Sequence, residues 1–244
     1  MPGAVLFLYM TCERYTVCMR KASEDAYVSE VMRRLIGRYS DKLQTELVHR
    51  NITELFVAVL LSPQCSDKQV NVVTKSLFKK YSGFEDYANA DLRALKRDLS
   101  GLNYYKTKAR NLRKAARMIM SRFDGEVPRT IDQLMELHGV GRKVANVILN
   151  EGFGISEHGI AIDTHCITVS RRLGLTRHKT ADRIELDLMR KVPKRDWKII
   201  SNLLIALGRD TCTARTKFCG RCVLKDICPS STERNHATST LSSG

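Results

Sequence analysis

The stretch Leu137-His138-Gly139-Val140-Gly141-Arg142-Lys143 carries two glycines between two segments of helical periodicity. Glycine has no Cβ, so Gly139 and Gly141 let the backbone turn tightly and approach a neighbouring group closely. The helix that follows such a turn begins with unpaired N–H groups and a partial positive charge, which together favour a phosphate. The stretch therefore predicts two helices joined by a tight turn at which an anion binds.

The glycines alone leave two interpretations of this turn open: an ordinary helix–helix connection with glycine caps, or a phosphate-binding turn. The charge of the chain favours the second one. The sequence has 41 Lys and Arg against 26 Asp and Glu, a formal net charge of +15 at pH 7, and such an excess indicates a polyanionic partner, nucleic acid before an anionic membrane surface. The turn then resembles the helix-hairpin-helix motif, which binds the DNA backbone, and the expected contacts are Gly139, Val140, Gly141 and Arg142.

Lys143 and Asp163 are the candidate catalytic residues. Lys143 lies in the first turn of the second helix, where the helix dipole disfavours a positive charge and favours the uncharged amine that an imine-forming nucleophile needs. A plain phosphate contact is the simpler role for this lysine. Asp163, in Ile162-Asp163-Thr164-His165, precedes another helix, so an N-cap is its simpler role. Its second role is that of a carboxylate facing the same cleft as Lys143.

Eight cysteines are present, and half of them follow the spacing Cys-x6-Cys-x2-Cys-x5-Cys at Cys212, Cys219, Cys222 and Cys228. Without a secretory signal, this spacing favours a metal site over disulfide bonds. Four thiolates suit either Zn²⁺ or a [4Fe–4S] cluster, and ligand chemistry alone leaves both open. The first loop between the cysteines carries Arg215 and Lys217, which we expect to contact phosphates, with a solvated basic loop as the alternative.

Helical periodicity runs through most of the 244 residues without convincing strand alternation, so we expect an all-α fold. Thr53 is the expected cap of a buried helix through Leu55–Leu61, and another helix is expected to start at Asp67. No apolar run is long enough to span a membrane, and Ala4–Tyr9 lacks the basic stretch that precedes a signal core. We therefore expect no membrane association and no targeting or secretion signal. For a prokaryotic source, this predicts a cytoplasmic, nucleoid-associated protein.

From about Tyr27 to Pro229 the chain resembles the endonuclease III family, the DNA glycosylases and AP lyases of the helix-hairpin-helix superfamily. The resemblance implies that Lys143 is the catalytic lysine and Asp163 the catalytic aspartate. It also implies that the four clustered cysteines hold a [4Fe–4S] cluster rather than zinc. Gln64, in Leu61-Ser62-Pro63-Gln64-Cys65, matches the family glutamine that enters the gap left by a flipped base. Tyr104 falls near the position of the wedge residue that parts the opposite strand.

The resemblance also implies the domain organisation, namely two helical domains with a groove between them. A central domain with the helix-hairpin-helix is expected over residues 45–153. A second domain, which contains the cluster, is expected to combine residues 23–44 with 154–230. Residues 1–22 are then an N-terminal extension, and residues 231–244 are a disordered tail.

The implied function is base excision DNA repair by a bifunctional enzyme, an N-glycosylase with β-eliminating AP lyase activity on damaged pyrimidines and abasic sites. Its expected partner is double-stranded DNA with base lesions or abasic sites, bound by a monomer. Two alternatives stay open. One is a monofunctional glycosylase of the same fold, whose known relatives lack a lysine at the position of Lys143. The other is a non-enzymatic DNA-binding or redox module. His138 departs from the family pattern, which usually has proline before the hairpin glycine.

Overall fold

The computed structural model describes residues 22–156 and 158–233, and all its named elements are helices. The expected all-α class is confirmed. In the described ranges, the only pairing of extended backbone is an isolated antiparallel bridge between Cys212 and Lys217. Residues 1–21 of the expected N-terminal extension and 234–244 of the expected tail lie outside the described residues. No helix among those described combines the length and the apolar character that a membrane span requires.

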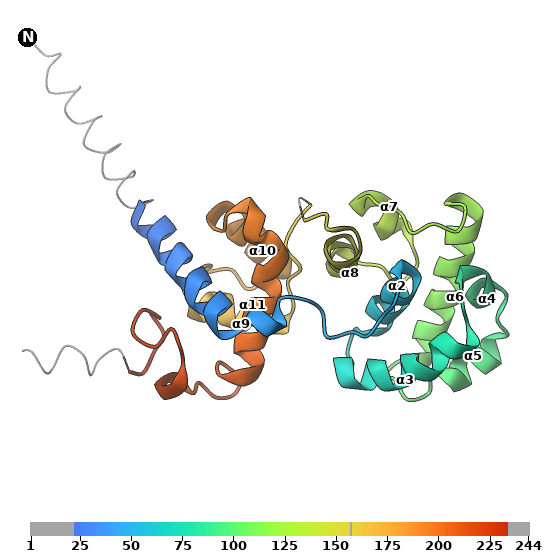
Figure 1. Cartoon of the computed structure of the whole chain (residues 1–244), viewed down its shortest axis with the longest axis horizontal. Coiled ribbons are helices and arrows are strands. Elements are labelled where there is room, and N and C mark those ends of the chain that lie inside the picture. Colours follow the sequence, from blue (N-terminus) through green and yellow to red (C-terminus); the bar gives the residue numbers. More distant parts are fainter. Residues whose placement is uncertain (1–21, 157, 234–244) are drawn as a thin grey trace, which may run out of the picture. The chain divides into compact units, whose positions relative to one another are not determined.

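The chain divides into two compact units (Figure 1). Gln44–Ala161 form one unit, and the described residues up to Leu43 join those from Ile162 onward in the other. Lys143 and the glycine turn therefore belong to the first unit, called the middle unit below. Asp163 and the four clustered cysteines belong to the second, called the terminal unit.

Seven α-helices and one π-helical turn are named in the middle unit: α2 (Ile52–Leu61), α3 (Asp67–Lys80), α4 (Phe84–Asn89), α5 (Leu92–Asp98), α6 (Tyr105–Arg122), α7 (Ile131–Glu136), α8 (Arg142–Val147) and η2 (Ile148–Gly152). The helix α2 is apolar on nearly every side and is buried from Glu54 to Leu61. A helix that is hydrophobic all round belongs in a core, and α3, α6, α8 and η2 pack against it. The short helix α4, which packs against α6, was not expected from the periodicity.

The starts of α2 and α3 are both capped by side chains, and the cap of α2 corrects an expectation from the sequence. We expected Thr53 to cap α2, but the N-cap is Asn51, whose side chain accepts a hydrogen bond from the main-chain N–H of Glu54 at 2.9 Å. Thr53 lies inside the first turn. Asparagine is among the best N-cap residues, because its short side-chain carbonyl reaches the amides of the first turn. The expected start of α3 at Asp67 is confirmed, with Ser66 as the cap.

The terminal unit joins a helix at residues 22–38 to the C-terminal part of the chain, whose elements are η1 (Ser40–Lys42), α9 (Thr164–Arg172), α10 (Ala181–Lys191), η3 (Lys194–Asp196), α11 (Trp197–Asp210) and η4 (Cys219–Arg221). Tyr27 in the first helix donates a hydrogen bond to the carbonyl of Leu173 at 2.8 Å. The helices α9 and α11 approach closely, since a Cβ at Gly208 would lie 2.9 Å from Nδ1 of His165. This packing fixes the start of α9, where Asp163 lies.

Candidate functional site

The turn between α7 and α8 depends on Gly139. Its φ is +85°, in the left-handed region, and an added Cβ would lie 2.9 Å from Nδ2 of Asn111 and 3.2 Å from Cδ1 of Leu60. Val140 next to it is buried, and its N–H donates to the carbonyl of Leu137 at 3.1 Å. The tight glycine turn expected from the sequence is confirmed. Val140 anchors it in the core of the middle unit and closes it through its own amide.

The start of α8 is open in the way that anion binding requires. Gly141 is the N-cap, contributes no side-chain hydrogen bond, and has nothing within 4 Å of where a Cβ would be. The first amides of a helix lack partners inside the helix, so without a capping side chain they are available to a ligand. Arg142 donates from Nη2 to the carbonyl of His158 at 3.2 Å, which ties the connection after η2 back to the hairpin.

Lys143 has a side chain that is exposed and that makes no hydrogen bond or ion pair with any described residue. It lies in the first turn of α8, which continues directly into the π-helical turn η2. Turns of this kind interrupt α-helices often at functional sites. The amine of Lys143 is thus accessible from solvent and not engaged by the described part of the chain.

Asp163 caps α9, as its simpler role predicted. Its Oδ1 accepts a hydrogen bond from the main-chain N–H of Cys166 at 2.8 Å, and the residue is half-buried. A carboxylate has two oxygens, and Oδ2 makes no hydrogen bond to a described residue. Capping therefore leaves one oxygen of Asp163 for another partner.

Gln64 and Tyr104 are both exposed loop residues of the middle unit, and both have a positive φ, 61° and 56°. Residues other than glycine rarely adopt this conformation, and such strain collects at functional sites. Asn103 donates from Nδ2 to the carbonyl of Gln64 at 2.6 Å. This hydrogen bond joins the two loops. Nothing in the sequence indicated that Asn103 would link them.

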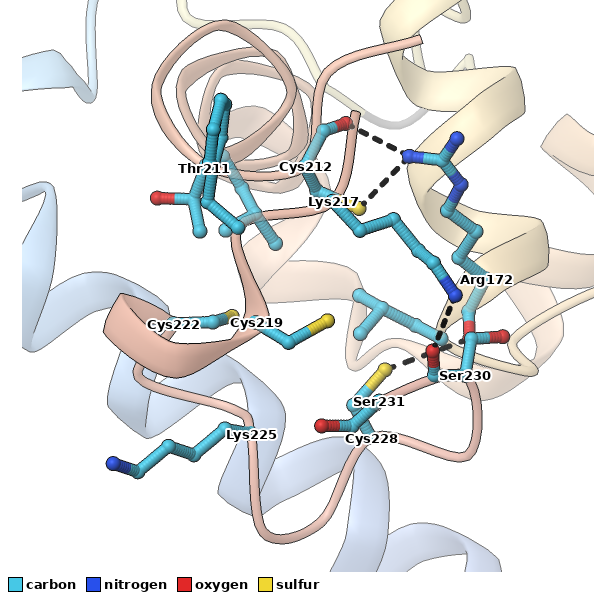
Figure 2. A pocket seen from close by; sticks show the side chains of 13 residues that line it. Arg172, Thr211, Cys212, Lys217, Cys219, Cys222, Lys225, Cys228, Ser230 and Ser231 are labelled. Carbon is cyan, nitrogen blue, oxygen red and sulfur yellow. Dashed lines mark hydrogen bonds between the residues drawn. The ribbon is translucent and has the colours of Figure 1, made fainter. Parts of the chain in front are cut away.

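All four clustered cysteines line one pocket of the terminal unit, which Figure 2 shows with the surrounding side chains. Within the described ranges, no three His, Cys, Asp or Glu side chains converge closely enough to hold one metal ion. The cysteines thus lie around a common space without meeting at one point. Four thiols in one pocket are a ligand set that suits either a zinc ion or an iron–sulfur cluster.

Arg172 of α9 is the main contact of this pocket that sequence reasoning missed. Its guanidinium donates to Sγ of Cys212 at 3.3 Å and to the carbonyls of Thr213 and Ala214 at 2.7 and 3.0 Å. Its own carbonyl lies 3.7 Å from Sγ of Cys228. One residue of α9 thus holds the first loop of the cysteine motif and touches its last cysteine (Figure 2).

The thiols of the pocket differ in acidity. Burial raises the pKa of Cys222 and of Cys228, and the neighbouring cysteines add to this because thiolates repel one another. Burial also acts to raise the pKa of Cys219, but hydrogen bonds from Thr232 and Ser231 outweigh it and lower that pKa overall. Cationic ligands that accept several thiolates remove this repulsion when they bind.

The two basic residues of the first cysteine loop are in different situations, although both are exposed. Lys217 donates from Nζ to the carbonyl of Ser230 at 2.9 Å, across the mouth of the pocket. Arg215 makes no hydrogen bond or ion pair with a described residue. Its guanidinium is therefore the more accessible of the two charges.

The sequence and the fold resemble those of known proteins throughout most of their length. The profile of the HhH-GPD superfamily base excision DNA repair proteins matches residues 57–194. Endonuclease III of Bacillus subtilis is 45% identical over 201 residues, which are 82% of this chain and 91% of that protein. Endonuclease III of Synechocystis is 41% identical over 184 residues, 75% of this chain and 84% of that protein.

A solved structure of a trapped covalent intermediate between an endonuclease III and DNA has the same fold. It superposes with a TM-score of 0.81 and is 40% identical, covering 86% of this chain and 98% of the other. A non-covalent endonuclease III–DNA complex matches with a TM-score of 0.81 and 39% identity, covering 87% of this chain and 98% of the other.

Proposed function

The chain belongs to the endonuclease III family of the HhH-GPD superfamily, and from this premise we propose that Lys143 is the nucleophile of its reaction and Asp163 the assisting carboxylate. Members of this family act in base excision DNA repair as DNA glycosylases and AP lyases, and this is the function of the chain. The observation that carries the assignment is the exposed amine of Lys143 at the uncapped start of α8, an amine that has no hydrogen bond or ion pair with a described residue. The matching DNA complex, which is a covalent intermediate, supports it.

In the proposed reaction Nζ of Lys143 attacks C1′ of the deoxyribose. A C–N bond to the lysine forms as the bond to the base breaks, and the base leaves with the electron pair. The sugar ring then opens to an imine, a cationic electron sink that acidifies the proton at C2′. Loss of this proton breaks the bond between C3′ and its phosphate oxygen. Water finally releases the lysine, so the enzyme turns over.

Asp163 supplies negative charge and a proton acceptor in this scheme. Oδ2 is the oxygen left over from capping α9. A carboxylate stabilises positive charge that develops on the sugar and accepts protons in the steps that follow. A half-buried anion held by a helix N-terminus keeps a fixed position, which is what such a role needs.

We further propose that Cys212, Cys219, Cys222 and Cys228 hold a [4Fe–4S] cluster. The four thiols share one pocket without converging on a point. The thiolate ligands of a cubane cluster are likewise spread over its separate iron atoms. When bound, the cluster cross-links the segment from α11 to the C-terminal end of the described chain. Its effect is structural: it holds the loop of Arg215 and Lys217 in one shape.

The proposed substrate is double-stranded DNA that carries a damaged pyrimidine or an abasic site. The turn residues Gly139 and Gly141 present main-chain amides to a phosphate. Val140 fixes this turn, and Arg142 adds positive charge beside it. Arg215 and Lys217 of the terminal unit are further proposed phosphate contacts. Gln64 and Tyr104 enter the duplex beside the extruded nucleotide.

Reductive trapping tests the lysine assignment. Borohydride reduces an imine between protein and abasic DNA to a stable amine, so the two migrate together on a denaturing gel. We expect the unmodified chain and Lys79→Ala to give this product, because Lys79 is an exposed lysine of α3 in the same unit. Lys143→Ala should reduce it at least a hundredfold.

The outcomes of this test separate the alternatives. A product that survives Lys143→Ala would show that another amine is the nucleophile. Absence of the product from every variant, with base release retained, would indicate a monofunctional glycosylase. Absence of both would indicate a DNA-binding module. A panel of duplexes with oxidised pyrimidines, uracil or mismatched thymine would then identify the preferred lesion.

A further inference from the structure

Gln64 and Tyr104 come from loops 40 residues apart in the sequence, yet they share an unusual backbone. Both have left-handed φ values, 61° and 56°, and Tyr104 exposes 70% of its surface. Such a conformation persists only where surrounding contacts hold it. An exposed aromatic ring also forgoes burial, so a partner outside the chain is its natural contact.

Two short hydrogen bonds hold these loops to each other. Asn103 donates from Nδ2 to the carbonyl of Gln64 at 2.6 Å. Gln69, in the first turn of α3, donates from Nε2 to the carbonyl of Gly101 at 2.6 Å. The bonds run in opposite directions: one goes from Asn103 to the loop of Gln64, and the other from the start of α3, which follows that loop, to Gly101. The loops therefore cannot separate without the loss of both.

A third contact lies beneath them. Lys108 of α6 has only 7% of its surface exposed, and its Nζ lies 3.0 Å from Sγ of Cys65, the residue after Gln64. A buried ammonium needs a partner, so this contact fixes the first loop against α6. The helix α6 begins directly after Tyr104, and the same helix thus supports both loops.

We propose that Asn103 is a positioning residue, which holds Gln64 and Tyr104 in their left-handed conformations and at a fixed spacing before DNA binds. This rests on the proposed function. The Gln64 side chain fills the space of the extruded nucleotide, and the Tyr104 ring stacks on the bases of the opposite strand. Since the loops are already joined, they lose little further conformational entropy when they enter the duplex. Asn103 sets the spacing of the Gln64 and Tyr104 side chains without touching DNA.

A duplex with a tetrahydrofuran abasic analogue opposite 2-aminopurine tests this proposal. The analogue is bound but not cleaved, and 2-aminopurine brightens when it loses its stacking partners. The variants are Asn103→Ala, Gln64→Ala and the double variant. Asn89→Ala is the matched control, an exposed asparagine at the end of α4 in the same unit. Asn103→His keeps an N–H donor at a similar reach.

We expect Asn103→Ala to bind the analogue duplex about five- to tenfold more weakly, the effect of about one lost hydrogen bond. The 2-aminopurine brightening should fall as well, while the affinity of Asn103→Ala for the undamaged duplex stays at the parent value. The control Asn89→Ala should keep the thermal midpoint of the parent chain. Asn103→His should restore most of the binding. Gln64→Ala should cost much less in the Asn103→Ala background than in the parent chain, because the two residues act through one element.

Additive effects of Asn103→Ala and Gln64→Ala, or unchanged binding and brightening in Asn103→Ala, would overturn the positioning role while the proposed function stands. A loss of affinity for undamaged DNA equal to that for the analogue would also overturn it, since that result indicates general loosening. A parent chain with no preference for the analogue duplex would instead contradict the proposed function itself.

Discussion

The guanidinium of Arg172 donates a hydrogen bond to Sγ of Cys212 at 3.3 Å. The same group holds the two carbonyls that follow Cys212, so one side chain fixes both a cluster ligand and the loop behind it. Hydrogen bonds of this kind orient metal ligands and stabilise negative charge on sulfur. Arg172 is therefore a supporting residue of the proposed cluster.

We predict that Arg172→Gln weakens retention of the cluster without abolishing its assembly. Glutamine is too short to replace all of the hydrogen bonds of the guanidinium, so iron per chain and visible absorbance should decay several times faster in the presence of a chelator. Arg171→Gln is the control, because Arg171 is the exposed neighbour on α9. Equal decay in the two variants would contradict the role of Arg172.

Gly139 and Gly141 are predicted to tolerate alanine differently. At Gly139 the φ of +85° and the approach of Asn111 to 2.9 Å both oppose a Cβ, so Gly139→Ala should lower the free energy of unfolding by about 2 kcal/mol. At Gly141 there is open space, and the loss there should stay below about 1 kcal/mol. Gly141→Ala should nevertheless weaken DNA binding, since its methyl group lies where a phosphate approaches. Chemical denaturation and DNA titration measure the two effects separately.

Asp163 has two roles that substitution can separate. Asparagine is as good an N-cap as aspartate, so Asp163→Asn should retain the stability of the chain, whereas Asp163→Ala should lose about 1 kcal/mol. Both variants lack the carboxylate and should slow base release by at least a hundredfold. Single-turnover rates beside thermal unfolding test this, and a fast Asp163→Asn variant would leave Asp163 with capping alone.

The cysteine loop is predicted to contact DNA chiefly through Arg215. Arg215→Ala should reduce the slope of log affinity against log salt concentration by about one, the value of one phosphate contact. Lys217→Ala should change the slope less, because Nζ of Lys217 is engaged with the carbonyl of Ser230. The measurement is a titration of undamaged duplex at several salt concentrations. Identical slopes for Arg215→Ala and the parent chain would exclude this contact.

Local pattern in the sequence was sufficient for much of the fold and for the candidate residues. Helical periodicity and caps such as Asp163 predicted most helices, because these signals act within one or two turns. The glycine turn and the cysteine spacing are likewise contained in short segments. The cap of α2 was wrong by two residues and α4 was missed, since several polar residues compete for a helix start and a six-residue helix carries little periodicity.

The sequence by itself determined the helical class, the glycine turn before Lys143 and the set of four thiols, each of which is a local property of a few neighbouring residues. Only the tertiary structure decided which distant side chains support them. Asn103 reaches Gln64 across 39 positions and Arg172 reaches Cys212 across 40. Such pairs produce no periodic pattern in the sequence, because their contact depends on how whole helices pack rather than on spacing along the chain.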